Sequence, residues 1–367
     1  MKRRDFIKYG ATLAGVGGAC VIFNGSTCLI GKADGINNTM DTRPCRIPFE
    51  TVEILQNGNA YPCVNDFLKY KEYEGNIANN SLDEIWNGKL HTDLRQRILN
   101  GDFSMCNRNI CVYQPCDKEN ISPDYKKGPK ELQLSYDFEC NYHCITCRDY
   151  VKINSPEEMK LYDEVYLPKI VELARNSEIV NLLGSGDPMF SRHARKLMTT
   201  LVKKYPKIKF NICTNGFLLN EKNINELGIQ NNIHGVFISV DAVNRDTYRN
   251  ILRTDGFDIV MENVKLMSEW KKQGKIEWMT INFVTHIMNY KEMPEFAKLA
   301  QKLDVMALFT VYRPWKSAEY YKKYDEVAVF EPKNKHYKEL VKILKDPVFK
   351  DKEHCYFDQW LANIVFT

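Results

Sequence analysis

From about residue 131 onward, short apolar segments alternate with longer amphipathic stretches, and this alternation is the feature that most constrains the fold. Six segments have the β-branched and aromatic content typical of strands: ELQLSY, IVNLL, KFNIC, GVFISV, WMTINFV and VMALFTV. Stretches with helical periodicity separate them. Strands connected through helices need right-handed crossovers and pair in parallel. The pattern therefore predicts an α/β fold, a partial (β/α)6 barrel rather than the eight-unit form.

Polar and glycine-rich clusters follow the first four predicted strands. Taken singly, sequences such as GSGDP and TNG are ordinary turn formers. Ligand sites of parallel sheets gather at the carboxyl ends of the strands, so four clusters in these positions predict one site. In chain order the clusters are Cys140 with Cys144 and Cys147, residues 184–188, residues 214–216, and Ser239 with Asp241.

The chain contains twelve cysteines, and their grouping favours iron–sulfur or metal ligation over a disulfide framework. The three thiolates at 140, 144 and 147 suffice for three corners of a [4Fe–4S] cluster and leave one iron without a protein ligand. Structural zinc would need a fourth ligand, and His143 sits too close to Cys144 to reach the same ion without strain. For Cys213, in a buried strand, we expect core packing, and the role of Cys355 stays open.

The first residues, MKRRDFIKYGATLAGVGG, have the charged start, apolar middle and small residues of a twin-arginine export signal. A basic, frayed N-terminus or a start codon placed too early is the alternative. The apolar run is too short and too rich in glycine for a stable membrane span. A net charge of +4, with both signs interspersed, gives no case for a nucleic-acid or membrane surface, so we expect no nucleic-acid partner. We expect four parts: a leader (1–35), a cysteine-rich module (40–125), the barrel (130–315) and a C-terminal extension (316–367).

The spacing C-x3-C-x2-C after a first strand, with GSGDP and SVDA following in order, resembles the radical S-adenosylmethionine (SAM) superfamily over residues 130–315. The resemblance implies a [4Fe–4S] cluster whose open iron chelates the amino and carboxylate groups of SAM. One electron from an external reductant would then cleave SAM into methionine and a 5′-deoxyadenosyl radical, which abstracts hydrogen from a substrate. The protein's part is to orient that substrate and to exclude water and oxygen.

The same resemblance assigns cofactor-binding residues. The segment after the second strand would bind the SAM amino group, with aspartate in place of the usual glutamate. Ser239 and Arg253 would contact the methionine carboxylate or the ribose, whereas Asp241 either joins them or caps the next helix. Thr146 departs from the family, which often has an aromatic residue there, so Tyr142 is the candidate for the adenine pocket. The residues of the amino-group segment are Gly184, Ser185, Gly186 and Asp187.

The N-terminal cysteine block resembles the SPASM/twitch auxiliary iron–sulfur module, including its GNI…SLDEIW segment. In most family members this module follows the radical domain, whereas here it precedes it. The resemblance implies a second, auxiliary [4Fe–4S] cluster. Cys111 and Cys116 are alternative fourth ligands, because five thiols are too few for two fully ligated clusters. The candidate ligands are Cys45, Cys63, Cys106, Cys111 and Cys116.

The resulting hypothesis is a radical SAM enzyme, an oxidoreductase or maturase, without an assigned catalytic side chain. Its partners would be SAM, an external one-electron reductant and a substrate. A peptide or protein side chain is the first expectation for the substrate and a sugar the second. The alternative is an exported iron–sulfur or electron-transfer protein that does not cleave SAM. The chemistry favours the cytoplasm and the leader favours export, so the sequence leaves the location open.

Overall fold

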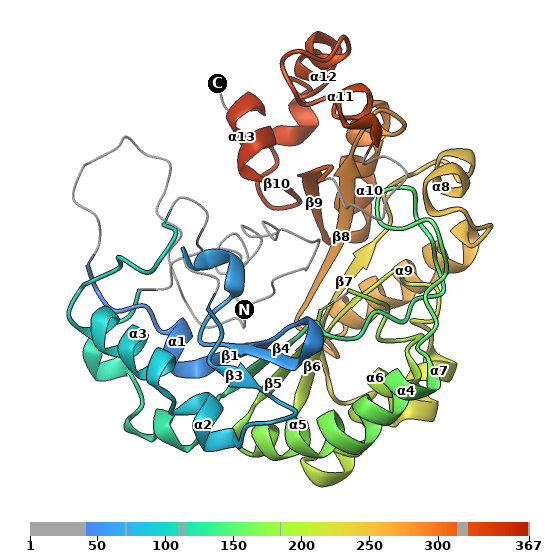
Figure 1. Ribbon diagram of the computed structural model, residues 1–367. Coiled ribbons are helices and arrows are strands. Elements are labelled where there is room, and N and C mark those ends of the chain that lie inside the picture. The colour runs from blue at the N-terminus through green and yellow to red at the C-terminus, as the bar shows by residue number, and fades with distance from the viewer. Residues whose placement is uncertain are drawn as a thin grey trace.

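The computed structural model describes residues 42–69, 72–108, 111, 115–183, 185–313 and 322–365. The predicted leader and Gly184 lie outside these described residues. The described chain forms one mixed sheet that bends into an open arch, with helices packed on its outer side (Figure 1). Ten strands are hydrogen-bonded in the order β10-β9-β8-β7-β6-β5-β4-β1-β2-β3.

All six predicted strands are present, and each pairs in parallel with the next one along the chain. The predicted α/β class and partial barrel are therefore confirmed. At least one helix lies between each of these six strands and the next one along the chain. The strands are β4 (Glu131–Leu134), β5 (Ile179–Leu182), β6 (Lys209–Thr214), β7 (Ile233–Ser239), β8 (Trp278–Thr285) and β9 (Met306–Val311).

The crossover helices bury apolar faces against the outer side of the sheet. Strand residues such as Val180, Ile212 and Val236 are fully buried there, with the helix residues Leu201 and Val264. Burial on this side gives the partial barrel its main core. The helices are α4 (Pro156–Lys160), α5 (Leu167–Leu173), α6 (Arg192–Lys204), α7 (Glu221–Leu227), α8 (Arg245–Leu252), α9 (Phe257–Lys272) and α10 (Met293–Leu303). The π-helix η6 (Leu161–Tyr166) links α4 to α5.

The inner side of the sheet carries a second, smaller apolar cluster. Trp278 lies across β7 at Gly235, where any side chain would overlap its indole. The other members of the cluster are Leu183, Cys213, Phe237 and Leu308, with Tyr356 packed against them. Cys213 is packed in this cluster, as predicted, and it also lines the cavity at the carboxyl ends of the strands.

The N-terminal module is joined to the barrel by its own strand. β1 (Thr51–Ile54) pairs in parallel with β4, and β2 (Asn59–Tyr61) and β3 (Gly75–Asn76) continue the sheet in antiparallel order. The module also contains α1 (Ile47–Glu50), α2 (Leu82–Trp86) and α3 (Lys89–Leu99). The start of α2 has the capping box that SLDEIW predicts, with hydrogen bonds of 2.7 and 3.3 Å between Ser81 and Glu84. Trp86 is buried core.

The C-terminal extension adds β10 (Cys355–Phe357), parallel to β9, at the other edge of the sheet. It also contains α11 (Tyr324–Val327), α12 (Tyr337–Ile343) and α13 (Gln359–Val365). Cys355 belongs to the main apolar core, and its Sγ lies 3.8 Å from the Val348 carbonyl oxygen. Among the described helices, none combines the length and the apolar character needed to cross a membrane.

Candidate functional site

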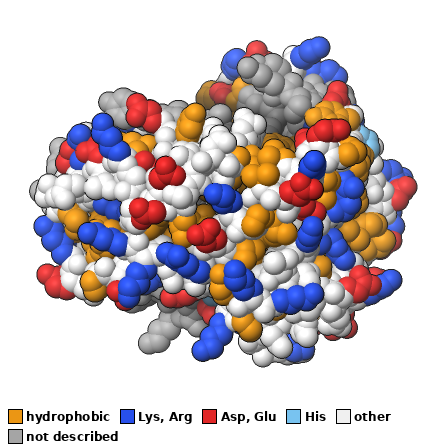
Figure 2. Space-filling model, turned by 60° about the horizontal axis from the view of Figure 1, so that its bottom comes forward, with side chains coloured by type: hydrophobic (Ala, Val, Ile, Leu, Met, Phe, Trp, Pro, Cys, Tyr) orange, Lys and Arg blue, Asp and Glu red, His pale blue; other side chains and the backbone are white. Residues whose placement is uncertain are grey.

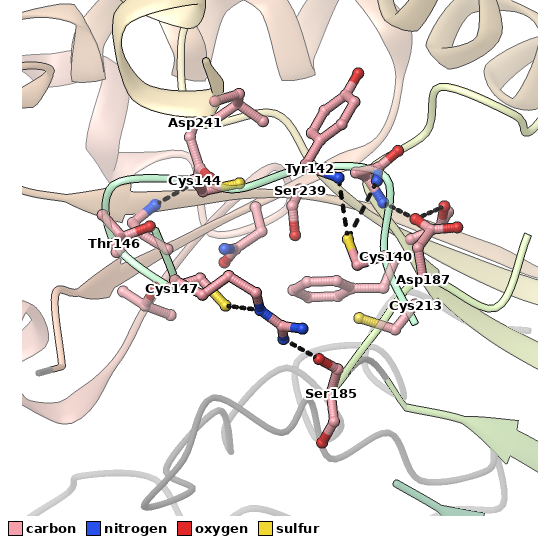
Figure 3. Close-up of a pocket in the computed structure, with 18 of the residues that line it drawn as sticks. Cys140, Tyr142, Cys144, Thr146, Cys147, Ser185, Asp187, Cys213, Ser239 and Asp241 are labelled. Carbon is pink, nitrogen blue, oxygen red and sulfur yellow. Dashed lines mark hydrogen bonds between the residues drawn. The ribbon is translucent and has the colours of Figure 1, made fainter. Parts of the chain in front are cut away.

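A cavity of about 210 Å³ opens at the carboxyl ends of the barrel strands (Figure 3). It is the place where the structure brings the predicted site residues together. The cysteine triplet lines it with the loops that follow β5, β6 and β7. Members of all four predicted clusters therefore meet at one edge of the sheet. The lining includes Cys140, Cys144, Cys147, Ser185, Gly186, Asp187, Thr214, Asn215, Ser239 and Asp241.

Backbone hydrogen bonds shape the cysteine loop. The Cys140 N–H donates to Lys152 O at 2.9 Å, and the Cys147 N–H donates to Cys144 O at 3.0 Å. Between them, the Ile145 N–H donates to Ile251 O of α8 at 3.0 Å. Hydrogen bonds therefore fix the start of the loop and its tight turn, and a third hydrogen bond holds the loop against the crossover helix α8.

The environment of the three thiols suits a cationic ligand. Burial raises the pKa of Cys140 to about 12, with further contributions from Asp187 and Cys147. Burial and the two neighbouring thiols likewise raise the pKa of Cys144 well above its usual value. Thiolates so close together need bound positive charge, which iron supplies. The donor set thus fits three corners of a [4Fe–4S] cluster.

Asp187 braces the loop after β5 against the end of β6. One carboxylate oxygen accepts hydrogen bonds from the Met189 and Phe190 N–H groups at 2.9 and 3.0 Å. The other accepts from the Thr214 hydroxyl at 2.7 Å and from the Asn215 N–H at 2.8 Å. Because a carboxylate has about four acceptor positions, these four bonds use its capacity.

Gly186 lets this loop approach the backbone that leads into the cysteine loop. A Cβ at this position would lie 2.7 Å from the Phe138 carbonyl carbon and 2.8 Å from the Glu139 nitrogen. The neighbouring Asp187 N–H donates to Glu139 O at 2.8 Å. Glycine is therefore required for contact between two backbone segments.

Asp241 occupies a left-handed backbone conformation with φ of 61° and is buried. Its Oδ1 accepts from the Val284 N–H at 2.7 Å, and burial raises its pKa to about 7. The alternative that Asp241 caps the next helix is wrong. Asn244 caps α8, accepting from the Asp246 N–H at 2.8 Å, because it stands directly before the first helical residue.

The other predicted cofactor contacts divide between the cavity and its surroundings. Ser239 and Thr146 line the cavity, as does Tyr142, whose hydroxyl lies 3.2 Å from that of Tyr248. Arg253 ends α8 in a left-handed conformation and is not among the described residues of the lining.

Sequence reasoning missed several residues of the cavity lining, among them Arg148 and Asn282. Arg148, which follows the third cysteine, is buried and donates through Nε to Cys147 Sγ at 3.4 Å. Asn282, near the end of β8, is 5% exposed, and its Oδ1 has no hydrogen-bond partner. Its place as a polar residue within the apolar run WMTINFV was the available signal.

Four of the five N-terminal cysteines form a second site within the module. Burial, together with the three other thiols, raises the pKa of Cys63 well above its usual value. Arg108 also lines this small cavity. Cys116 is absent from its described lining, although its N–H donates to Pro44 O at 2.9 Å. The four cysteines are Cys45, Cys63, Cys106 and Cys111.

Family models match both parts of the chain. The model of the radical SAM superfamily matches residues 138–300, and that of the SPASM iron–sulfur cluster-binding domain matches residues 45–117. The radical SAM domain implies a [4Fe–4S] cluster with SAM, and the SPASM domain implies an auxiliary iron–sulfur cluster.

Curated relatives carry the name GTP 3′,8-cyclase. A probable GTP 3′,8-cyclase of Saccharolobus solfataricus is 28% identical over 177 residues, 48% of this chain and 54% of the relative. The GTP 3′,8-cyclase of Synechocystis sp. is 26% identical over 193 residues, 52% of this chain and 56% of the relative. The chain spans about half the length of the curated relatives it matches.

Solved structures with detectable similarity include methylornithine synthase (PylB), with a TM-score of 0.36, 12% identity and coverage of 59% of this chain and 60% of that one. Archaeal TYW1 gives a TM-score of 0.29 with 16% identity over 44% of this chain and 59% of that one. Taking both family models together, the chain belongs to the radical SAM superfamily and carries a SPASM domain N-terminal to its radical SAM domain.

Proposed function

We propose that this chain is an enzyme that cleaves SAM reductively and uses the resulting radical to abstract hydrogen from a substrate. The observation that carries the proposal is the single cavity shared by three cysteines, the loop after β5 and the polar end of β7. When bound, the cluster supplies the electron that splits SAM into methionine and a 5′-deoxyadenosyl radical.

The chain's own residues divide the work of binding. Cys140, Cys144 and Cys147 would hold the cluster, and Ser239 and Asp241 would hydrogen-bond SAM from the end of β7. Asp187 would act as a brace that presents the backbone of its loop, since its acceptor positions are engaged.

Gly184, Ser185 and Gly186 remain the proposed contacts for the SAM amino group. Arg253 is left out of the proposed contacts, because it does not line the cavity.

For the auxiliary cluster, the second site supports a four-cysteine ligand set. Cys111 shares that site with three other thiols, whereas Cys116 does not line it. Cys111 is therefore the proposed fourth ligand. A cluster with four protein ligands has no open iron, so its proposed role is electron transfer or structural support.

The described residues of the cavity lining carry charged groups of both signs. They include the carboxyl groups of Asp187 and Asp241 and the guanidinium groups of Arg148 and Arg313. Arg148 is engaged by its own loop. We keep a peptide or protein side chain as the first proposed substrate and a sugar as the second, and the name of the curated relatives adds GTP as a further candidate.

The proposal is tested with anaerobically reconstituted protein, SAM and dithionite. We expect 5′-deoxyadenosine, detected by liquid chromatography and mass spectrometry, and its loss in Cys144→Ala. Cys355→Ala, which removes a cysteine of the main core that is not among the described residues of the cavity lining, is the matched control and should retain the product. Absence of 5′-deoxyadenosine from protein with a full complement of iron would refute SAM cleavage and favour the electron-transfer alternative. That alternative has no need of a cavity of this size beside the cysteines.

A further inference from the structure

Arg148 makes three hydrogen bonds with the surroundings of the cysteine loop. Its Nε donates to Cys147 Sγ at 3.4 Å, and Nη1 donates to Phe138 O at 2.8 Å. Nη2 donates to Ser185 O. Dashed lines at Cys147 and Ser185 in Figure 3 mark two of these bonds. The guanidinium therefore has one proposed cluster ligand and two backbone carbonyls around it.

These contacts give the guanidinium a fixed place. Arg148 is only 6% exposed, and its cationic carbon lies 5.9 Å from the centre of the Phe138 ring. The Phe138 carbonyl precedes the cysteine loop in the chain, and the Ser185 carbonyl belongs to the loop after β5. A planar fork with several donors suits this arrangement, which the single ammonium of lysine could not reproduce.

We propose that Arg148 is a positioning residue that raises the reduction potential of the cluster held by Cys147. The inference rests on the proposed cluster site. Reduction adds one negative charge to the cluster, so a fixed cation and an N–H···S bond at one of its ligands stabilise the reduced form more than the oxidised form. Burial strengthens the effect, because little water screens the charge.

The magnitude follows from the contact. The N–H···S bond stabilises the reduced cluster more than the oxidised cluster, because the reduced cluster carries the additional negative charge. Losing this bond selectively from the reduced form should lower the ratio of reduced to oxidised cluster about tenfold at a given potential, which corresponds to about 59 mV for one electron.

The test is an anaerobic redox titration followed by electron paramagnetic resonance (EPR) on reconstituted full-length protein. The signal that changes when SAM is added identifies the cluster of the triplet and separates it from the auxiliary cluster. Arg148→Gln should keep this signal and shift its midpoint to a lower potential. Arg148→Lys retains the charge and should shift it less. Arg175→Gln is the control. Arg175 precedes the amino end of β5, whereas the cavity lies at the carboxyl ends of the strands, and its side chain donates to Lys127 O.

An unshifted midpoint in Arg148→Gln, or a shift no larger than in Arg175→Gln, would overturn the inference. Loss of the SAM-sensitive signal from both Arg148 variants, with circular dichroism unchanged, would also overturn it, because the arginine would then only hold the loop. Absence of a SAM-sensitive signal from the wild-type protein is a different result and refutes the proposed cluster site instead.

Discussion

Asp241 carries a buried carboxylate on a backbone conformation that few residues adopt. Its φ of 61° lies in the left-handed region, which asparagine and aspartate tolerate better than other side chains do. The conformation is held from three sides: the Asp241 N–H donates to Asn282 O at 3.1 Å, its Oδ1 accepts from Val284, and its carbonyl accepts from Asn289 at 2.9 Å. Backbone strain of this kind concentrates at functional sites.

The carboxyl of Asp241 should make stability depend on pH. Its pKa is raised to about 7 from an ordinary 3.8, so between these values the folded chain keeps a proton that the unfolded chain has released. The stability of the wild-type protein relative to Asp241→Asn should therefore fall as pH rises through this window, by about 4 kcal/mol at most. Urea unfolding of both metal-free proteins at pH 4.5 and pH 8 measures the change. If the two proteins differ by the same free energy of unfolding at pH 4.5 and at pH 8, that result would contradict the raised pKa.

Gly186 gives a second prediction at the scale of single residues. In Gly186→Ala the added methyl meets the backbone of Phe138 and Glu139, so the two loops must move apart at a cost of about 1–3 kcal/mol. We expect lower thermal stability together with reduced iron content at the triplet. Gly274→Ala is the control, since nothing lies within 4 Å of its added methyl and only its positive φ adds strain. Equal effects of the two substitutions would contradict the close approach.

At the scale of elements, side-chain hydrogen bonds connect the loops that follow the strands, so these loops are not independent turns. Asp187 links the loop after β5 to the end of β6, and Arg148 links the same loop to the cysteine loop. The sequence predicted that these clusters share one edge, because parallel strands present their carboxyl ends together. It could not predict these hydrogen bonds, since they join residues 27 and 37 positions apart.

The module's cysteines give a prediction at the same scale. Cys111→Ser should lower the iron content of the reconstituted protein from about eight to about four atoms per chain, because it opens the four-thiol site. Cys116→Ser should leave the content near that of the wild-type protein. Iron and acid-labile sulfide analyses measure both. The reverse pattern would assign the fourth ligand to Cys116.

At the scale of the whole molecule, the module and the barrel share one sheet. β1 pairs with β4 over four residues, so the barrel's first strand is an interior strand only while the module is present. The space-filling view in Figure 2 shows charged side chains of both signs spread over the face in view, with apolar side chains interspersed. This agrees with the interspersed charge of the sequence.

Removal of the module should therefore expose a strand edge. A chain that begins at residue 128 would leave β4 unpaired on one side, and unpaired edges promote association between chains. We expect poor solubility and early elution in size-exclusion chromatography. A matched chain that lacks only residues 1–35 should elute as the full-length protein does. A soluble, monomeric barrel with unchanged thermal stability would contradict the structural role of β1.

The sequence by itself determined the α/β class, the six strands, the cysteine triplet and the order of the motifs along the barrel. These are local signals: a period of hydrophobicity, a spacing of three thiols, or a turn after a strand. Only the tertiary structure decided that β1 joins β4, that Cys111 lines a small cavity with three other thiols, and that Arg148 is buried in the lining of the larger cavity. Such contacts depend on how distant segments pack, and no local pattern carries that information.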